Sequence, residues 1–282
     1  MKTGIFSIGI IGGTGGMGKW FSKFFRRAGY PVVATGRTRG PDYASLAAAC
    51  PVVIVSVPIA VTEDVIRKIG PCLPKESLLL DLTSLKEGPV RAMLAASVAE
   101  VIGLHPLFGP GVSSLSGQNI AVCPARGNSW LPWLRDILEK NGARLMETTP
   151  ARHDELMAVI QALNHFLTAV LGLSVATAGI EPEELRHFST PVFRERLDHL
   201  HRLFSQPDLY AHLIAGNPYG KKLIISAINN LEALLAPVRE GDAATLAKQL
   251  RAISESSPSP GSDTHESAEE RLRQTDERQS EE

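Results

Sequence analysis

The stretch that decides the fold is Ile8-Gly9-Ile10-Ile11-Gly12-Gly13-Thr14-Gly15-Gly16-Met17-Gly18. Its first four residues form a short apolar run that predicts a buried strand. After the turn, large apolar side chains recur at helical spacing, at Met17, Trp20, Phe21, Phe24 and Phe25. Gly13, Gly15 and Gly18 thus form a Gly-x-Gly-x-x-Gly turn between strand and helix, which predicts a dinucleotide pyrophosphate on the helix N-terminus. The alternative is a strand–helix turn without a ligand.

The residues after the next predicted strand, Val32–Thr35, bear on which dinucleotide binds. They are Gly36, Arg37, Thr38 and Arg39. An NAD-preferring domain usually presents Asp or Glu at this point to the ribose 2′-hydroxyl, and no carboxylate stands here. Because Arg binds phosphate bidentately, Arg37, Thr38 and Arg39 favour NADP over NAD. The alternative is that both arginines are solvated loop residues.

Length and composition restrict the class of protein. The 282 residues are 44% hydrophobic, which is enough to bury a core, and the length suggests about two domains. A formal net charge of −1 argues against a nucleic-acid partner. The three cysteines are widely separated and form no ligand cluster, so neither a disulfide framework nor a metal site is expected. The N-terminus does not have the order of a signal peptide, and we therefore expect a cytoplasmic protein.

The chain is predicted to fall into three segments. In residues 1–150 short β-rich runs alternate with helical patterns, which predicts an α/β domain with a Rossmann-type, doubly wound parallel sheet that binds a dinucleotide. Residues 151–253 show no comparable strand and predict an all-helical domain. Residues 254–282 are polar and predict a disordered acidic tail. The expected strands are Gly9–Ile11, Val32–Thr35, Val52–Val57, Leu78–Leu82, Val101–Leu104 and Asn119–Cys123, and the expected helical segments are Leu156–Leu173, Val192–Phe204, Leu209–Ile214 and Leu223–Leu235.

One apolar segment, Leu156–Ala178, is long enough to span a bilayer. Gln161, Asn164 and His165 interrupt it, and these polar groups would be costly in lipid. We therefore expect a helix that is buried on all sides, inside a helical domain or against a second subunit, and no membrane partner.

Candidate site residues follow the predicted strands, because ligands of open α/β sheets bind beyond the carboxyl ends of the strands. Ser56, Val57 and Pro58 come after the third strand and would lie against the cofactor. His105 follows the fifth strand directly and is a candidate general base. Ser84, after the fourth strand, could orient the substrate oxygen that His105 deprotonates. The alternatives are a histidine that merely caps a strand and a serine that caps a helix.

The chain resembles the prephenate dehydrogenases of tyrosine biosynthesis over almost all of residues 8–235. The resemblance is carried by six stretches: Ile10–Phe21, Val53–Ile59, Asp81–Lys86, Gly103–Pro110, Ile160–Phe166 and Phe193–Phe204. It implies a homodimer formed through a helical dimerisation and substrate domain. It also implies an oxidoreductase that transfers a hydride from prephenate to NADP or NAD and releases CO2, giving 4-hydroxyphenylpyruvate.

The same resemblance implies roles for individual residues. His105 would be the base, Ser84 would contact the substrate hydroxyl, and Arg202 would hold a substrate carboxylate. Arg202 lies beside a predicted buried stripe of Leu197, Leu200, Leu203 and Phe204, although so charged a helix is usually solvated. His165 and Gln161 are candidates for the substrate pocket, and Arg194 is a further one. We expect the other histidines to be structural or exposed: His153, His187, His199, His201 and His212.

Three other functions compete with this prediction. An arogenate dehydrogenase would act on a substrate with an amino group in place of the keto group, and the sequence does not separate the two. A β-hydroxyacid dehydrogenase would need a lysine in the first helix of the second domain, and Leu156–Ala178 contains none. A redox sensor that binds NADP without turnover is the non-catalytic alternative.

Overall fold

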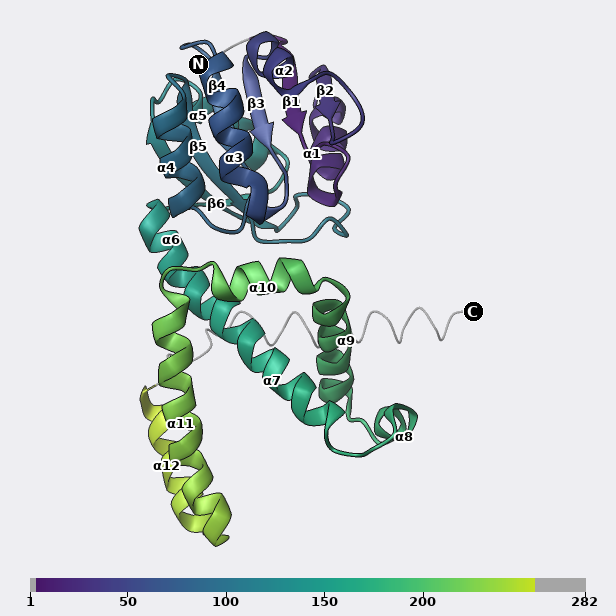
Figure 1. Cartoon of the computed structure of the whole chain (residues 1–282), viewed down its shortest axis with the longest axis vertical. Helices are drawn as coiled ribbons and strands as arrows, with labels where there is room; N and C mark the ends of the chain where they lie inside the picture. Colours follow the sequence, from purple (N-terminus) through teal and green to yellow (C-terminus); the bar gives the residue numbers. More distant parts are fainter. Residues whose placement is uncertain (1–3, 257–282) are drawn as a thin grey trace. The chain divides into compact units, whose positions relative to one another are not determined.

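A computed structural model of the chain describes residues 4–256 (Figure 1). Its contacts divide the chain into two compact units, residues 1–225 and 226–282. The sheet and most of the helical region belong to the first unit. The second unit holds most of α11 (Gly220–Glu240) and all of α12 (Ala243–Ser256).

The first half of the chain forms one seven-stranded sheet in the order β2-β1-β3-β4-β5-β6-β7. The strands are β1 (Ile8–Ile11), β2 (Val32–Thr35), β3 (Val52–Val55), β4 (Leu78–Asp81), β5 (Glu100–Pro106), β6 (Asn119–Arg126) and β7 (Arg144–Glu147). The predicted α/β class, with a doubly wound sheet and a helical region after it, is confirmed.

Two details of the sheet differ from the prediction. The expectation of a wholly parallel sheet is wrong at β6, which runs antiparallel to β5. No helix connects these two strands, and a parallel partner would need a crossover of that kind. The edge strand β7 was not predicted, because Arg144, Met146 and Glu147 are exposed and leave no apolar pattern to detect.

Helices cover both faces of the sheet: α1 (Gly16–Arg27), α2 (Tyr43–Ala49), α3 (Ile59–Ile69), α4 (Glu87–Ala96) and α5 (Leu131–Lys140), with a short 3₁₀ turn at Gly70–Cys72. Successive strand residues point to opposite faces, so the sheet contributes to two cores. Ile54 and Leu80 belong to the core with Phe21 of α1 and Leu134 of α5. Val53 and Leu79 belong to the core with α2, α3 and α4.

The region after β7 is helical throughout its described residues. It comprises α6 (Pro150–Met157), a π-helical segment η2 (Ala158–Leu163), α7 (Asn164–Ala176), α8 (Pro182–His187), α9 (Pro191–Ser205), α10 (Pro207–Ala215), α11 and α12. The four expected helical segments are present, whereas α8 and α12 were not predicted. Proline is the first residue of α6, α8, α9 and α10, where its missing N–H costs nothing. The α12 helix runs three residues into the segment expected to be disordered, and the rest of that segment lies outside the described residues.

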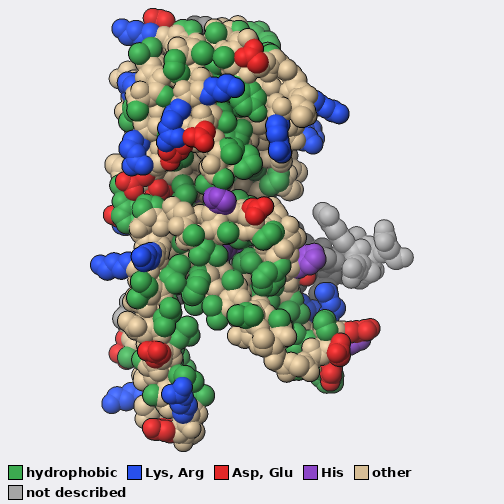
Figure 2. All heavy atoms as spheres, in the orientation of Figure 1, with side chains coloured by type: hydrophobic (Ala, Val, Ile, Leu, Met, Phe, Trp, Pro, Cys, Tyr) green, Lys and Arg blue, Asp and Glu red, His purple; other side chains and the backbone are tan. Residues whose placement is uncertain are grey.

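The apolar segment is less covered than predicted. Within the described chain, Pro150–Ala176 is the one helix long and apolar enough to cross a membrane by length and composition. Val159, Ile160 and Leu173 are 53%, 55% and 66% exposed, so the expectation of burial on all sides is wrong for the single chain. On the face drawn in Figure 2, hydrophobic side chains gather over α7 and α10. Cover by a second subunit, the other part of that expectation, stays a prediction.

The predicted buried stripe on α9 is also only partly present. Leu200 and Leu203 are buried, but Phe204 is 55% exposed. Its ring nevertheless lies against Gly172 of α7, where an added Cβ would come within 2.5 Å of it. Phe204 therefore packs on one side only.

Candidate active site

The glycine turn between β1 and α1 is tightly built. Gly12 has φ +83°, a conformation that other residues rarely adopt, and a Cβ there would collide with the carbonyl of Ser56. A Cβ on Gly18 would collide with the carbonyl of Gly12, and one on Gly13 would lie 2.7 Å from Cβ of Ala34. These glycines are needed for the packing of the turn against the strands and of the helix against the turn.

The outward side of the same turn is open. A Cβ on Gly15 would have only the Gly12 carbonyl, at 3.3 Å, as a neighbour. No side chain caps the N-terminus of α1, and Thr14, Gly15 and Gly16 are exposed. The N–H groups of the first helical turn therefore lack side-chain acceptors, which is the arrangement that receives phosphate oxygens.

The loop after β2 is held in place by its own hydrogen bonds. Oγ1 of Thr35 donates to the carbonyls of Arg39 at 2.9 Å and Pro41 at 2.7 Å. Gly36 has no room for a side chain, because a Cβ there would collide with Oγ1 of Thr14. Arg37, Thr38 and Arg39 are exposed, and the structure between residues 4 and 256 pairs neither arginine with a carboxylate. Both guanidinium groups are thus available to an anion.

A buried row of three side chains ends at the predicted base. Nδ1 of His105, at the end of β5, lies 2.9 Å from Nε2 of His153 in α6. Nδ1 of His153 lies 2.8 Å from Oδ1 of Asp154. All three residues are at least 97% buried. His153, which was expected to be structural or exposed, is buried, and its contact with His105 was not predicted.

The hydrogen bonds from Asp154 through His153 to His105 indicate which nitrogen of each imidazole carries a proton. The Asp154 carboxylate accepts, so His153 carries its proton on Nδ1 and presents a bare Nε2. Nδ1 of His105 must then donate to His153, and this leaves Nε2 of His105 as an unprotonated acceptor. A third group that orients a base through a hydrogen bond is typical of catalytic triads.

The environment of His105 favours the neutral imidazole. Burial, followed by repulsion from His153 and from the Lys86 ammonium, holds the pKa of His105 well below its ordinary value. Nδ1 of His105 contacts His153, and among the described residues no carboxylate contacts this ring to oppose the effect. His105 is therefore able to accept a proton throughout the neutral range.

Asp154 also joins the helical region to the sheet. Its Oδ1 accepts the backbone N–H of Lys86 at 2.8 Å, and its Oδ2 accepts that of Glu87 at 2.9 Å. It thereby caps the N-terminus of α4, where a negative charge is favourable. Nδ2 of Asn217 donates to the Asp154 carbonyl at 2.8 Å and fixes the backbone at this point.

A buried ion pair lies beneath the end of β5. The Lys86 ammonium contacts Oδ2 of Asp81 and donates to the carbonyl of Leu104 at 2.9 Å, directly before His105. Both side chains are completely buried. Oδ2 of Asp81 also accepts the N–H of Thr83 at 3.0 Å, and this shapes the turn that carries the half-buried Ser84. Because β4 and β5 are parallel neighbours, Ser84, just after β4, and His105, near the end of β5, lie at the same edge of the sheet.

A cleft of about 580 Å³ brings the end of β3 against the corner between α9 and α10. Pro58, Ile59 and Ala60 line one wall, and Ser205–Leu209 with His212 line the other. Arg202 lies on the last turn of α9 beside this corner, where its carbonyl accepts the Ser205 hydroxyl at 2.8 Å. The expected cofactor residue Pro58 and the neighbourhood of Arg202 are therefore brought together. His212, which was expected to be structural or exposed, lines the cleft.

His165 and Gln161 lie in a different environment. The His165 ring meets Tyr210 of α10 edge-on, with 4.8 Å between centroids, and lies 5.8 Å from the His199 ring of α9. Oε1 of Gln161, Nδ1 of His165 and Nε2 of His199 are buried without a hydrogen-bond partner. Burial, followed by repulsion from His199, lowers the pKa of His165. These unsatisfied atoms are available to a polar ligand.

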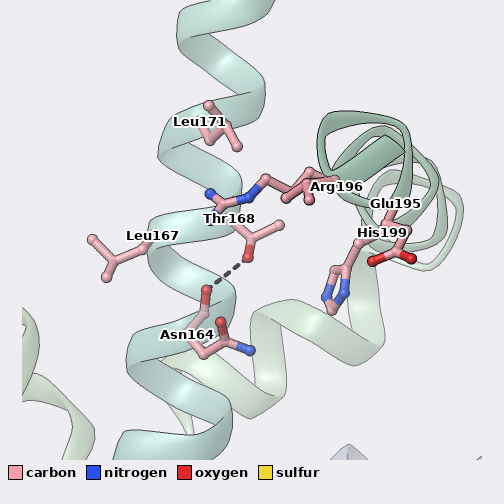
Figure 3. Close-up of a pocket in the computed structure, with 8 residues that line it drawn as sticks. Asn164, Leu167, Thr168, Leu171, Glu195, Arg196 and His199 are labelled. Atoms are coloured by element: carbon pink, nitrogen blue, oxygen red, sulfur yellow. Dashed lines mark hydrogen bonds between the residues drawn. The ribbon is translucent and has the colours of Figure 1, made fainter. Parts of the chain in front are cut away.

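A hollow of about 530 Å³ opens between α7 and α9 next to this group (Figure 3). His199, Glu195 and Arg196 line it from α9, and Asn164 and Thr168 line it from α7. Figure 3 shows the Arg196 side chain extending from α9 toward Thr168. Arg194 is exposed on α9 and lies outside this set of lining residues. Within the described residues, no hydrogen bond, ion pair or ring contact joins His165, Gln161, Arg194 or Arg202 to His105.

The two residues that orient the proposed base were not identified from the sequence. His153 and Asp154 follow the last strand by only a few positions, and nothing in their spacing points back to β5. The only signal was the buried position of His105 itself, since a buried imidazole needs partners for its ring nitrogens. Hydrogen bonds and one ion pair join His105, His153, Asp154, Lys86 and Asp81 into a connected set.

The sheet and its glycine turn place the chain in the class of nucleotide-binding α/β proteins. Residues 33–147 match the family model for the nucleotide-binding domain of prephenate dehydrogenase, and residues 149–252 match the model for its dimerization domain. The chain belongs to the prephenate dehydrogenase family.

Individual relatives agree with this assignment. A T-protein of Enterobacter agglomerans is 38% identical over 234 residues, which are 83% of this chain and 62% of the relative. A probable arogenate/prephenate dehydrogenase of Methanocaldococcus jannaschii is 33% identical over 86% of this chain and 59% of its own length. This chain therefore spans about three-fifths of the length of these two relatives.

A solved structure shares the fold. Prephenate dehydrogenase from A. aeolicus, in complex with hydroxyphenyl propionate and NAD+, superposes with a TM-score of 0.71 at 18% identity. The match covers 91% of this chain and 98% of that one.

We predict that His153→Gln lowers kcat by at least about tenfold, because His105 loses the partner that fixes its tautomer. The pH profile should change as well. Wild-type kcat/KM should fall only as the pH drops through the depressed pKa of His105, below about 6.5. Without repulsion from His153 this acid limb should move to higher pH.

The matched control is His201→Gln, an exposed position on α9. It should leave both kcat and the acid limb unchanged. An unaltered limb and kcat in His153→Gln would remove the orienting role.

Proposed function

We propose that this chain is a prephenate dehydrogenase, an oxidoreductase that converts prephenate to 4-hydroxyphenylpyruvate in tyrosine biosynthesis. The observation that carries the proposal is the bare Nε2 of His105, which the row to Asp154 sets in place at the carboxyl end of the sheet. Family membership supplies the substrate class.

The reaction needs a base, and His105 supplies it. Nε2 of His105 takes the proton of the C4 hydroxyl as the C4–H hydride leaves and C4 becomes a carbonyl. The C1–CO2 bond then breaks, and its electron pair enters the ring and gives the aromatic phenolate. This oxygen takes back the proton held by His105 and becomes the phenol. A bound nicotinamide dinucleotide supplies the hydride acceptor. Ser84, after the neighbouring strand, would hold the same oxygen in line with His105.

The dinucleotide would be held by the glycine turn and the ends of β2 and β3. Backbone N–H groups of Gly13–Gly18 would receive the pyrophosphate, and Ser56, Val57 and Pro58 would line the path toward His105. Arg37, Thr38 and Arg39 would hold the 2′-phosphate of NADP, which we favour over NAD. The open outward side of the turn and the unpaired guanidinium groups support this placement.

The substrate would lie between the sheet and the helical region. Arg202, beside the cleft at the α9–α10 corner, would hold one carboxylate. His165 and Gln161, whose buried polar atoms lack partners, would bind the side chain, and Arg194 is a further candidate. We propose residues 1–150 as the nucleotide-binding domain and residues 151–253 as the helical domain of a cytoplasmic homodimer.

An assay of prephenate and arogenate, each with NAD and NADP, tests the activity. We expect the highest kcat/KM with prephenate and NADP. His105→Asn should lower kcat by about 10²–10⁴-fold, the usual contribution of a general base, with KM for NADP retained. Preference for arogenate would assign the alternative substrate. Turnover of neither substrate would leave an NADP-binding sensor, and near-normal kcat in His105→Asn would refute the base.

Arg37→Ala tests the choice of cofactor. It should weaken NADP binding by about 1.5–3 kcal/mol, the range for hydrogen bonds to a charged group, and leave NAD binding nearly unchanged. Isothermal titration with both dinucleotides measures the difference. Arg67→Ala, another exposed arginine, is the matched control and should change neither affinity. Equal losses for NADP and NAD would exclude the 2′-phosphate role of Arg37.

The dimer is tested by analytical ultracentrifugation. We expect a species of about twice the 30.4 kDa chain mass, because the exposed apolar face of Pro150–Ala176 needs cover. Leu173→Glu, in that face, should shift the protein toward the monomer. Val98→Glu, an equally exposed apolar position outside the helical region, should not. A monomeric wild type, or a dimer insensitive to Leu173→Glu, would count against this interface.

A further inference from the structure

A cationic groove runs along α1, and the proposed reaction does not use its charged residues. It has a volume of about 770 Å³. One wall is α1 from Gly16 to Arg27, and the other is the loop between β5 and β6, from Pro110 to Leu115. Asn141, after α5, closes it.

Three cations stand in a row on the α1 wall. Lys19, Lys23 and Arg27 are spaced four residues apart, so they share one helix face at intervals of about 6 Å. All three are exposed, and within residues 4–256 none is paired with a carboxylate. Like charges at this spacing repel one another, so the row favours a bound counter-anion.

Two other exposed cations of the sheet domain differ in this respect. Arg67 pairs with Glu63 and Asp64 on α3, and Lys140 pairs with Asp136 on α5. Lys68 and Arg91 also form no ion pair among the described residues, so what distinguishes α1 is that three unpaired cations line one wall of the same groove.

The opposite wall adds hydrogen-bond donors on a well-anchored loop. Ser113 and Ser114 bring two exposed hydroxyl groups to the groove. Nε1 of Trp20 donates to the Val112 carbonyl at 2.7 Å and ties the loop to α1. The Trp20 ring also meets Phe108 edge-on and stacks on Phe24. These contacts hold α1 and the loop between β5 and β6 together.

We propose that this groove binds a small molecule carrying two or more phosphate groups. A row of cations about 12 Å long matches several linked anionic groups better than a single carboxylate, which one cation would satisfy. Lys23 and Arg27 lie about 10 and 16 Å along α1 from Gly16, beyond the dinucleotide phosphates at the glycine turn. The groove therefore adjoins the proposed cofactor site at Gly16, and the charged residues Lys23 and Arg27 lie outside that site.

Isothermal titration of the full chain with inorganic tripolyphosphate tests the proposal, with and without saturating NADP. We expect binding in both cases, with an affinity that falls as salt is raised. The double variant Lys23→Glu/Arg27→Glu should weaken it by about tenfold or more. The matched control Lys68→Glu/Lys75→Glu reverses two exposed lysines elsewhere and should leave it unchanged. ATP and adenosine, as further titrants, show whether the phosphates alone suffice or a nucleoside strengthens binding.

Three results would overturn the proposal. They are absence of tripolyphosphate binding to the wild type, loss of binding when NADP is saturating, and equal weakening in the two double variants. Thermal melting of each variant verifies that it is folded. The NADP affinity of Lys23→Glu/Arg27→Glu should remain that of the wild type, which separates this groove from the proposed dinucleotide site.

Discussion

The Asp154 carboxylate is the point on which the site depends. It accepts hydrogen bonds from the N–H groups of Lys86 and Glu87 at the start of α4 and from the imidazole of His153, and Lys86, His153 and Asp154 itself are buried. One side chain of the helical region thus completes a helix cap in the sheet domain and, through His153, orients the proposed base His105 on β5. A buried carboxylate without these donors would be strongly unfavourable, so the cap and the base are coupled through a single group.

The Lys86–Asp81 pair provides the second constraint. The ammonium group contacts Asp81 and the carbonyl that precedes His105, and its charge contributes to the low pKa of the imidazole. The end of β4, the end of β5 and the start of α4 are therefore joined by one connected set of polar contacts. This arrangement holds the proposed base, while the proposed substrate residues His165 and Arg202 lie on helices α7 and α9, whose apolar faces are incompletely covered in the single chain.

Much of the nucleotide-binding half could be predicted from the sequence, because its signals are local. The apolar run before Gly12 and the helical spacing after Gly18 predict strand, turn and helix, and the strand ends place Ser56, Ser84 and His105 at one edge of the sheet. Local signals failed where the outcome depends on distant residues. The antiparallel direction of β6 follows from its loop connection, and β7 has no apolar alternation. Phe204 has the helical spacing of a core residue, yet about half of its surface is exposed to solvent in the single chain.

The sequence by itself determined the α/β class, the glycine turn and the lack of a carboxylate at Gly36, since each depends on residue types within a few positions. Only the tertiary structure decided how the base is oriented. His105 and His153 are 48 residues apart, and their hydrogen bond exists because α6 returns to the end of β5. It also decided that Gly36 has no room for a side chain, since Thr14 fills the space, and that Lys19, Lys23 and Arg27 face a groove. Contacts between segments so far apart arise from packing, which no short pattern in the chain records.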